Sequence, residues 1–406
     1  MDPVANPFAP GAGSRPPALA GRDELLEAAD IALRRIQAGR HAKSMMLLGL
    51  RGVGKTVLLV RIGELAEATG YATALIEAPE ERRLAGLLVP RLRSLLYRLS
   101  RSEKARILSN QALGALRNFA SAFKVSYAGL EVGVNAEPGL ASSGDLETDL
   151  TDLLVLVGEA AKAADQPTAI LIDEVQYLND EDLSALIVAL HRISQRALPL
   201  IMLGAGLPQL AAVSGEAKSY AERLFAFPNV RPLDESSIET AIRVPIEEAG
   251  ASISDDALSE IGARTEGYPY FLQEWGAHSW DAAPESRITR RDVVSAGTKA
   301  VAALDASFFR VRFDRLTPKE QEYLRAMAEL GPGPHRSGEV AAELGIAVTS
   351  AGPRRTGLIA KGMIWSPSHG LTAFTVPMFD RYMLRAMPDW PPAESQRPQR
   401  SRKNDS

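Results

Sequence analysis

Short apolar runs alternate with helical patterns along the first half of the chain. The apolar runs predict buried strands over residues 44–49, 71–77, 168–172 and 198–203. Helical periodicity lies between them, over 55–69, 146–164 and 181–196. Short apolar strands separated by helices are typical of a parallel sheet with helices on both faces. The pattern therefore predicts an α/β core.

One stretch interrupts this alternation. Residues 84–116 predict one or two helices, and 124–134 alternates loosely like a hairpin, so we interpret 84–145 as an insertion into the core. Leucines recur there at helical spacing among the densest basic residues of the chain: Arg82, Arg83, Arg91, Arg93, Arg98, Arg101, Lys104 and Arg106. An amphipathic helix with its arginines in water explains this pattern. A surface that faces DNA or another subunit is the functional alternative.

Strand patterns end near residue 233, and residues 233–308 predict a small, entirely helical domain. Thr289 and Asp292 have the spacing of a capping box at the start of its last helix. Residues 1–18 are rich in Pro, Gly and Ala, which predicts a leader or a strap over another surface. Residues 388–406 contain few apolar positions and predict a disordered basic tail. The core itself is then residues 19–232.

The segment 309–387 has the pattern of a third domain. Thr317, Pro318 and Glu320 form a strong helix start. Two further helices, at 337–344 and 349–361, precede a hairpin made by 363–366 and 371–376. This order resembles a winged helix, whose third helix would present Arg354, Arg355 and Lys361 to DNA. Contact with protein alone is the alternative use of the same fold.

Composition excludes several classes of protein. The 406 residues carry 46 Lys plus Arg and 50 Asp plus Glu, a net charge of -4, so any nucleic-acid surface must be a local patch. With 0 cysteines, the chain has no disulfide, thiolate zinc site or cysteine nucleophile. The apolar stretch 198–213 is interrupted by prolines and shorter than the ~20 residues of a membrane span. We therefore predict a cytoplasmic protein that contacts no membrane.

A phosphate-binding loop follows the first predicted strand. The residues Gly49-Leu50-Arg51-Gly52-Val53-Gly54-Lys55-Thr56 match G-x-x-x-x-G-K-[ST] between a strand and a helix. Gly49, Gly52, Val53 and Gly54 would turn backbone N–H groups toward phosphate oxygens. Lys55 can reach the β- and γ-phosphates, and the Thr56 hydroxyl can bind Mg²⁺.

Two carboxylates follow the third strand. Asp173 and Glu174 come directly after the apolar run 169–172, at the edge of a parallel sheet where ligands bind. Asp173 would hold Mg²⁺, and Glu174 would act as general base on the attacking water. The pair favours ATP hydrolysis over phosphoryl transfer to a small metabolite.

Together these motifs resemble the AAA+ class of P-loop ATPases, and within it the clade of origin-recognition-type initiators and STAND signalling ATPases. A box that lies near the adenine in that clade is resembled by Leu19-Ala20-Gly21-Arg22-Asp23-Glu24-Leu25. Glu24 stands one position earlier here than the glutamate of that box. Gly267-Tyr268-Pro269 resembles the G-x-P turn of the STAND lid, which touches the nucleotide. The resemblance implies that Gly21, Arg22, Tyr268 and Pro269 border the bound nucleotide. It covers residues 19–385.

The resemblance also implies that Arg223 is an arginine finger that reaches the γ-phosphate bound by a neighbouring subunit. A surface ion pair with Glu222 or Glu216 is the alternative.

Two features depart from the family. The fourth strand ends in Gly204, Ala205 and Gly206, without a polar water-sensing side chain, and 270–273 lacks the usual sensor arginine. Both losses predict slow hydrolysis.

The sequence thus predicts a P-loop NTPase parallel sheet of the AAA+ type, followed by a helical lid and a winged helix. The expected function is a slow ATPase switch that converts ATP and water to ADP and phosphate, with Mg²⁺ as cofactor. Duplex DNA and a nucleotide-dependent homo-oligomer or protein partner are the expected contacts. The alternative is a STAND-like signalling or defence scaffold whose winged helix contacts only protein.

Overall fold

The computed structural model covers residues 1–406 and describes all of them except 12–15, 80–82, 101, 126–138 and 391–406. The chain forms two compact units. The sheet unit consists of Gly11–Gly49 and Val53–Thr240, and the helical unit of Met1–Pro10, Leu50–Gly52 and Ala241–Ser406. The expected hairpin at 124–134 and the expected tail at 388–406 lie almost wholly outside the described residues.

A five-stranded parallel sheet forms the centre of the sheet unit, in the order β2-β3-β4-β1-β5. Every residue of β1, β3 and β4 is buried, because helices cover both faces of the sheet. This arrangement confirms the predicted α/β fold. The strands are β1 (Ser44–Leu48), β2 (Ala72–Glu77), β3 (Thr168–Asp173), β4 (Leu200–Gly206) and β5 (Phe225–Ala226).

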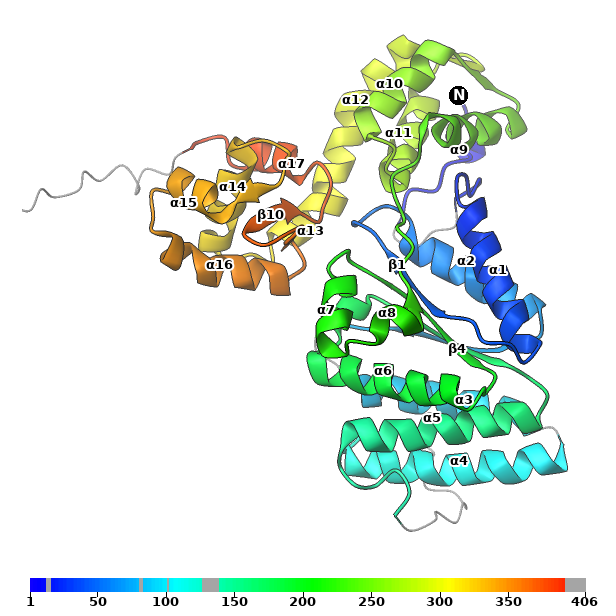
Figure 1. Ribbon diagram of the computed structural model, residues 1–406. Helices are drawn as coiled ribbons and strands as arrows, with labels where there is room; N and C mark the ends of the chain where they lie inside the picture. Colours follow the sequence, from blue (N-terminus) through cyan, green and yellow to red (C-terminus); the bar gives the residue numbers. More distant parts are fainter. Residues whose placement is uncertain (12–15, 80–82, 101, 126–138, 391–406) are drawn as a thin grey trace, which may run out of the picture. The chain divides into compact units, whose positions relative to one another are not determined.

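Helices of the sheet unit form two layers. Helices α1 and α2 cover one face of the sheet, and α3 to α6 lie on the other (Figure 1). Short helices α7 and α8 lead into β5. The helices of this unit are α1 (Asp23–Gln37), α2 (Lys55–Ala68), α3 (Leu84–Leu99), α4 (Glu103–Ala122), α5 (Leu146–Ala163), α6 (Asp180–Gln195), α7 (Leu210–Ala217) and α8 (Ala221–Leu224).

The first part of the insertion predicted over 84–145 contributes to the main hydrophobic core. Residues of this part form two helices, α3 and α4. Helix α3 ends at Leu99, and α4 begins after Ser102, whose side chain caps it by accepting a hydrogen bond of 3.2 Å from the backbone of Ala105. Leu92, Leu96 and Phe119 are fully buried in one cluster with residues of α5, α6 and the sheet. The leucine pattern is therefore explained by burial.

Helix α9 (Glu235–Glu248) leads from one unit into the other, where three further helices follow: α10 (Asp255–Thr265), α11 (Pro269–Ala282) and α12 (Arg290–Leu304). Thr289 and Asp292 form the predicted capping box before α12. The prediction of an entirely helical domain missed two strands, β6 (Ser252–Ile253) and β7 (Arg287–Ile288), which pair in parallel. Strands of two residues are too short to show an alternating pattern.

The first residues of the chain pack on α11. A 3₁₀ turn, η1 (Pro3–Ala5), is followed by Phe8, whose side chain is buried against Gly276. A Cβ atom at Gly276 would lie 2.7 Å from the Phe8 ring, so only glycine leaves space for it. Asn6 donates a hydrogen bond of 3.0 Å to the carbonyl of Ala277, and Trp280 donates one of 2.8 Å to that of Asp2.

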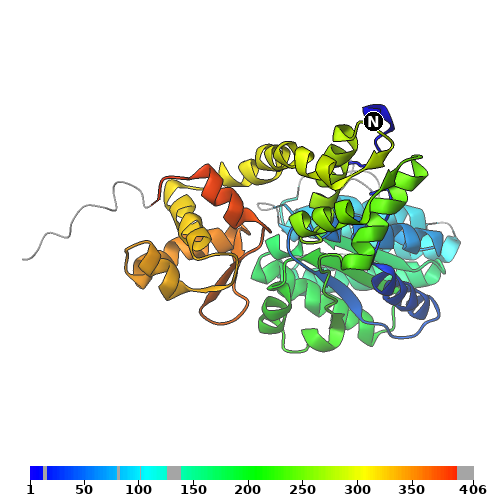
Figure 2. The same cartoon turned by 90° about the horizontal axis from the view of Figure 1, so that it is seen from above.

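After α12 the chain continues through a π-helical turn, η3 (Asp305–Phe309), and α13 (Arg310–Phe313), drawn in yellow in both ribbon views (Figures 1 and 2). The segment then enters the C-terminal module, which we define as residues 316–386. Phe309 stacks on Tyr382 with ring centroids 5.2 Å apart, and Arg385 binds Asp305 at 2.9 Å. These contacts connect η3 to the last helix of the module.

The C-terminal module combines four helices with a three-stranded antiparallel sheet in the order β8-β10-β9. Thr317 and Glu320 form the predicted capping box of its first helix. The short strand β8 and the last helix were not predicted. The elements are α14 (Pro318–Glu329), β8 (His335–Arg336), α15 (Ser337–Glu343), α16 (Val348–Ala360), β9 (Ile364–Trp365), β10 (Leu371–Phe374) and α17 (Phe379–Ala386).

Candidate active site

The phosphate loop connects β1 to α2. Gly52 and Gly54 have φ angles of 82° and 89°, which side-chain-bearing residues rarely adopt. A Cβ atom at Gly49 would lie 2.5 Å from the carbonyl oxygen of Val230, so this position also requires glycine. Gly54 is the N-cap of α2 and supplies no side-chain cap. The N–H groups of the first turn are therefore suited to an anion.

Lys55 is the first residue of α2, and its side chain turns back across the loop. It is buried, and its Nζ atom donates a hydrogen bond of 3.0 Å to the carbonyl oxygen of Gly49. A buried ammonium at a helix N-terminus concentrates positive charge at the loop.

Asp173 ends β3 next to the loop. Burial raises the pKa of its carboxyl group, while a hydrogen bond from Thr56 and the charge of Lys55 act in the opposite direction. The structure thus brings together a hydroxyl, a carboxylate and an ammonium from two elements. Hydroxyl and carboxylate oxygens are ligands that suit Mg²⁺, so Thr56 and Asp173 fit this ion.

Glu174 follows Asp173 in a left-handed backbone conformation, with φ of 54° and ψ of 39°. Its backbone N–H donates to Asp173 Oδ1 at 2.8 Å. A left-handed conformation is unfavourable for glutamate, and such strain is often found at functional sites. The conformation turns the chain from β3 into the short 3₁₀ turn η2 (Val175–Tyr177).

Gln176, which the sequence analysis did not identify, contacts Glu174 directly. Its Nε2 atom donates to Glu174 Oε2, and its Oε1 atom accepts a hydrogen bond of 3.1 Å from the backbone of Leu207, just beyond β4. No motif in the sequence indicates this residue, because the contact depends on how the ends of β3 and β4 lie together.

Gly204, Ala205 and Gly206 at the end of β4 are all buried. They provide no polar side chain at this strand end, as the sequence predicts. A Cβ atom at Gly204 would lie 2.4 Å from Met46 Sδ, and one at Gly206 would lie 2.9 Å from Gln176 Oε1. An alanine at either position would therefore force the end of the Met46 or Gln176 side chain to move.

Arg22 supports the phosphate loop, and Gly21 directly before it packs against Ser237. Gly21 has φ of 64°, and a Cβ atom there would lie 2.4 Å from Ser237 Oγ. Arg22 is buried, and its Nη2 atom donates hydrogen bonds of 2.9 Å to the carbonyl oxygens of Val53 and Arg231. Burial lowers the Arg22 pKa, and the charge of Asp234 opposes this effect. The guanidinium thus holds the backbone of the loop.

Tyr268 and Pro269 lie at the start of α11 in the helical unit. Gly267 before them has φ of 72°, and Pro269 occupies the first helical position. Tyr268 is buried, with its ring centroid 5.9 Å from that of Phe271, and burial raises its pKa. The G-x-P segment is therefore a well-packed helix start.

Arg223 lies on α8, and its side chain is exposed. In the part of the chain that the structure describes, its guanidinium makes no ion pair, so neither Glu222 nor Glu216 holds it. An exposed arginine without a carboxylate partner is available to another molecule.

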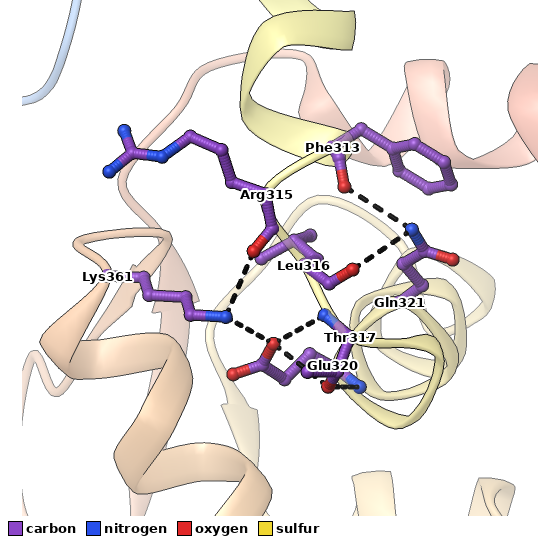
Figure 3. Close-up of polar contacts among 7 residues, drawn as sticks. All are labelled: Phe313, Arg315, Leu316, Thr317, Glu320, Gln321 and Lys361. Atoms are coloured by element: carbon purple, nitrogen blue, oxygen red, sulfur yellow. Dashed lines mark hydrogen bonds and ion pairs between the residues drawn. The ribbon is translucent and has the colours of Figure 1, made fainter.

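The three cations expected to bind DNA have partners within the C-terminal module. Arg354 pairs with Glu322 at 3.0 Å. Arg355 donates to Thr372 Oγ1 at 3.0 Å and to the carbonyl of Leu371 at 3.2 Å. Lys361 donates to Glu320 at 2.7 Å and to the carbonyl of Arg315 at 3.0 Å, as Figure 3 shows. All three side chains are only partly exposed.

No helix among the described residues is both long and apolar enough to span a membrane. No group of three or more His, Asp or Glu side chains among them is arranged to hold a metal ion.

Comparison with known proteins identifies the class. Residues 18–203 match the AAA ATPase domain family, and residues 306–383 match a domain of unknown function. Residues 18–203 therefore form an AAA ATPase domain, which confirms the resemblance to the AAA+ class of P-loop ATPases seen in the motifs of this segment. Among curated proteins, no sequence relative is found.

Several solved structures are similar to the whole chain. The Walker-type ATPase PABY2304 of Pyrococcus abyssi has a TM-score of 0.57 at 17% identity, over 91% of this chain and 97% of that one. Cdc6p of Pyrobaculum aerophilum has a TM-score of 0.46 at 16% identity, over 96% and 98%. The Orc1 protein of Aeropyrum pernix in complex with DNA has a TM-score of 0.45 at 14% identity, over 91% and 93%. The similarity to the Pyrococcus abyssi ATPase shows that the two chains share a fold.

Proposed function

We propose that this protein is an ATP-driven molecular switch that binds ATP with Mg²⁺ at residues 49–56 and hydrolyses it slowly. The observation that carries the proposal is the convergence of Lys55, Thr56, Asp173 and Glu174 at the carboxyl ends of β1 and β3. In parallel sheets this edge is where ligands bind and where chemistry occurs.

Each residue has a defined role in the proposal. The N–H groups of Gly52, Val53 and Gly54 receive phosphate oxygens, and Lys55 adds positive charge at the β- and γ-phosphates. The expected role of the Gly49 N–H is corrected, because it donates a hydrogen bond of 3.2 Å to the carbonyl oxygen of Gly206. Mg²⁺, when bound by Thr56 and Asp173, neutralises charge that develops on the phosphates. The Glu174 carboxylate accepts the proton of the attacking water.

Slow turnover is proposed because the end of β4 lacks a polar side chain and 270–273 lacks an arginine. By their resemblance to the family motifs, Gly21, Arg22, Tyr268 and Pro269 are proposed to border the nucleotide. Arg223 is proposed to act on the γ-phosphate bound by a neighbouring copy, which would make the complete site a property of an assembly. Its exposure without an ion pair supports this role.

Two candidates exist for the output of the switch. The order α14, β8, α15, α16, β9 and β10 supports a winged helix, and such a fold can place α16 in the major groove of DNA. Against this, Arg354, Arg355 and Lys361 have partners inside the module. The exposed side chains of α16, which include Val348, Thr349 and Thr356, are uncharged. This neutral surface supports contact with a protein partner instead.

Calorimetric titration with ATP tests the nucleotide site. Lys55→Ala should abolish tight ATP binding, because the phosphates lose their nearest point charge. Lys43→Ala, a change of another lysine near β1 but outside the loop, is the control and should retain wild-type affinity. A folded Lys55→Ala protein that binds ATP as tightly as the wild type would contradict the proposal.

A further inference from the structure

Gln176 connects the ends of two neighbouring strands through its side-chain amide. It is the second residue of η2, directly after the acidic pair that ends β3. Its N–H donates to Glu174 Oε2, and its carbonyl oxygen accepts from the Leu207 backbone at 3.1 Å. The half-buried Gln176 amide therefore makes one hydrogen bond to the expected general base and another to the backbone that follows β4.

Gly206 provides the space that this amide occupies. A Cβ atom there would lie 2.9 Å from Gln176 Oε1 and 3.0 Å from Leu210 Cδ2. Its φ is not in the left-handed region, so the backbone itself does not require glycine. The end of β4 has no polar side chain of its own, and the amide of Gln176 from η2 lies beside it instead.

We propose that Gln176 is a positioning residue that holds the Glu174 carboxylate in place for the attacking water. The proposal rests on the proposed ATPase function and names a further residue of that same site. A carboxylate can accept about four hydrogen bonds, so a hydrogen bond from Gln176 is compatible with the role of Glu174 as a proton acceptor. The backbone of Glu174 is in a strained conformation, which a second attachment through the side chain helps to maintain.

The expected size of the effect follows from the kind of interaction. A hydrogen bond to a charged group has a strength that corresponds to about a 10- to 100-fold change in rate when it is lost at the reacting geometry. In the proposal, Gln176 acts through Glu174 and not on the phosphates. Its loss should therefore change kcat and leave the affinity for ATP almost unaltered.

Steady-state turnover and ATP titration of four variants test the proposal. Gln176→Ala should lower kcat by about 10- to 100-fold at unchanged ATP affinity and Tm. Gln176→Glu, which replaces the donor by a second carboxylate, should lower it at least as much. Gly206→Ala should have a similar effect because its methyl group displaces the amide, whereas Gly215→Ala, at a glycine with open space around it, should not.

A double variant separates positioning from a structural role. In a Glu174→Gln background, Gln176→Ala should cause no further loss of turnover, since Gln176 acts through Glu174. An equal additional loss in that background would show that Gln176 acts on the fold, and would overturn the proposal. Wild-type turnover of Gln176→Ala would also overturn it. Wild-type turnover of Glu174→Gln would instead reject Glu174 as the base, and with it the wider ATPase mechanism.

Discussion

The Arg354 guanidinium forms an ion pair of 3.0 Å with Glu322, from α16 to α14 within the C-terminal module. A phosphate group that binds Arg354 must compete with this carboxylate. DNA binding through α16 therefore predicts opposite effects for changes at the two partners. The pair gives a direct way to test whether α16 is a DNA-binding helix.

If α16 binds duplex DNA, replacing Arg354 and Arg355 by alanine should weaken the complex. The slope of log affinity against log salt concentration should fall by roughly one unit for each lost phosphate contact. Glu322→Gln should strengthen binding, because it frees the Arg354 charge for phosphate. Fluorescence anisotropy with labelled duplex, at several salt concentrations, measures both effects.

Arg287→Ala, which removes an exposed arginine outside the module, serves as the control. If the wild-type protein has no affinity for duplex DNA at low salt, with or without ATP, the DNA role is excluded. The neutral surface of α16 would then be assigned to a protein partner.

Arg223 gives a prediction about assembly. If its guanidinium acts on the γ-phosphate bound by a neighbouring copy, turnover per chain should increase with protein concentration. Arg223→Ala should lower turnover but leave ATP affinity nearly unchanged, since the charge matters most as the γ-phosphate departs.

Mixing two inactive variants tests the same point more sharply. Arg223→Ala supplies an intact phosphate loop and Lys55→Ala an intact Arg223, so a mixed pair contains one complete site. The mixture should be more active than the sum of its parts. No gain, in a sample that light scattering shows to contain mixed oligomers, would reject a finger that acts between subunits.

Asp173 predicts a pH dependence of stability in the absence of Mg²⁺. Burial raises its pKa in the folded state above the value in the unfolded chain, so the folded state binds the proton more tightly. The contribution of the Asp173 carboxyl to the free energy of unfolding is therefore greatest at low pH and decreases as pH rises through the raised pKa. Asp173→Asn removes the buried charge while it keeps the shape of the side chain.

The free energy of unfolding in urea should consequently be higher for Asp173→Asn than for the wild type at alkaline pH, and the difference should shrink as pH falls. Asp180→Asn, at an exposed position, should show no such trend. A difference that grows toward acid pH would have the wrong sign for a carboxyl with a raised pKa.

Much of the fold follows from local patterns in the sequence. The buried strands β1, β3 and β4 each contain a continuous apolar run, and the loop 49–56 has the spacing of a phosphate loop between a strand and a helix. Capping boxes at Thr289 and Thr317 are local interactions over three residues, so both could be predicted. Features of this kind depend on neighbours in the chain.

Contacts between distant residues were not predictable in the same way. Gln176 binds the Leu207 backbone across two strand ends, and Phe8 fills a space beside Gly276. The sequence places Lys361 at the end of the predicted DNA-binding helix but does not reveal its ion pair with Glu320, which is far from it in the chain (Figure 3). Each of these contacts depends on the packing of separate elements, which no local pattern encodes.

The most direct test of the central claim separates ATP binding from hydrolysis at Glu174. Glu174→Gln retains the size of the side chain and removes the base, so ATP should bind with wild-type affinity while single-turnover hydrolysis falls by ~10²-fold or more. Glu216→Gln, an exposed glutamate on α7, should hydrolyse ATP at the wild-type rate. If Glu174→Gln hydrolyses bound ATP as fast as the wild type, this residue is not the base and the proposed mechanism is wrong.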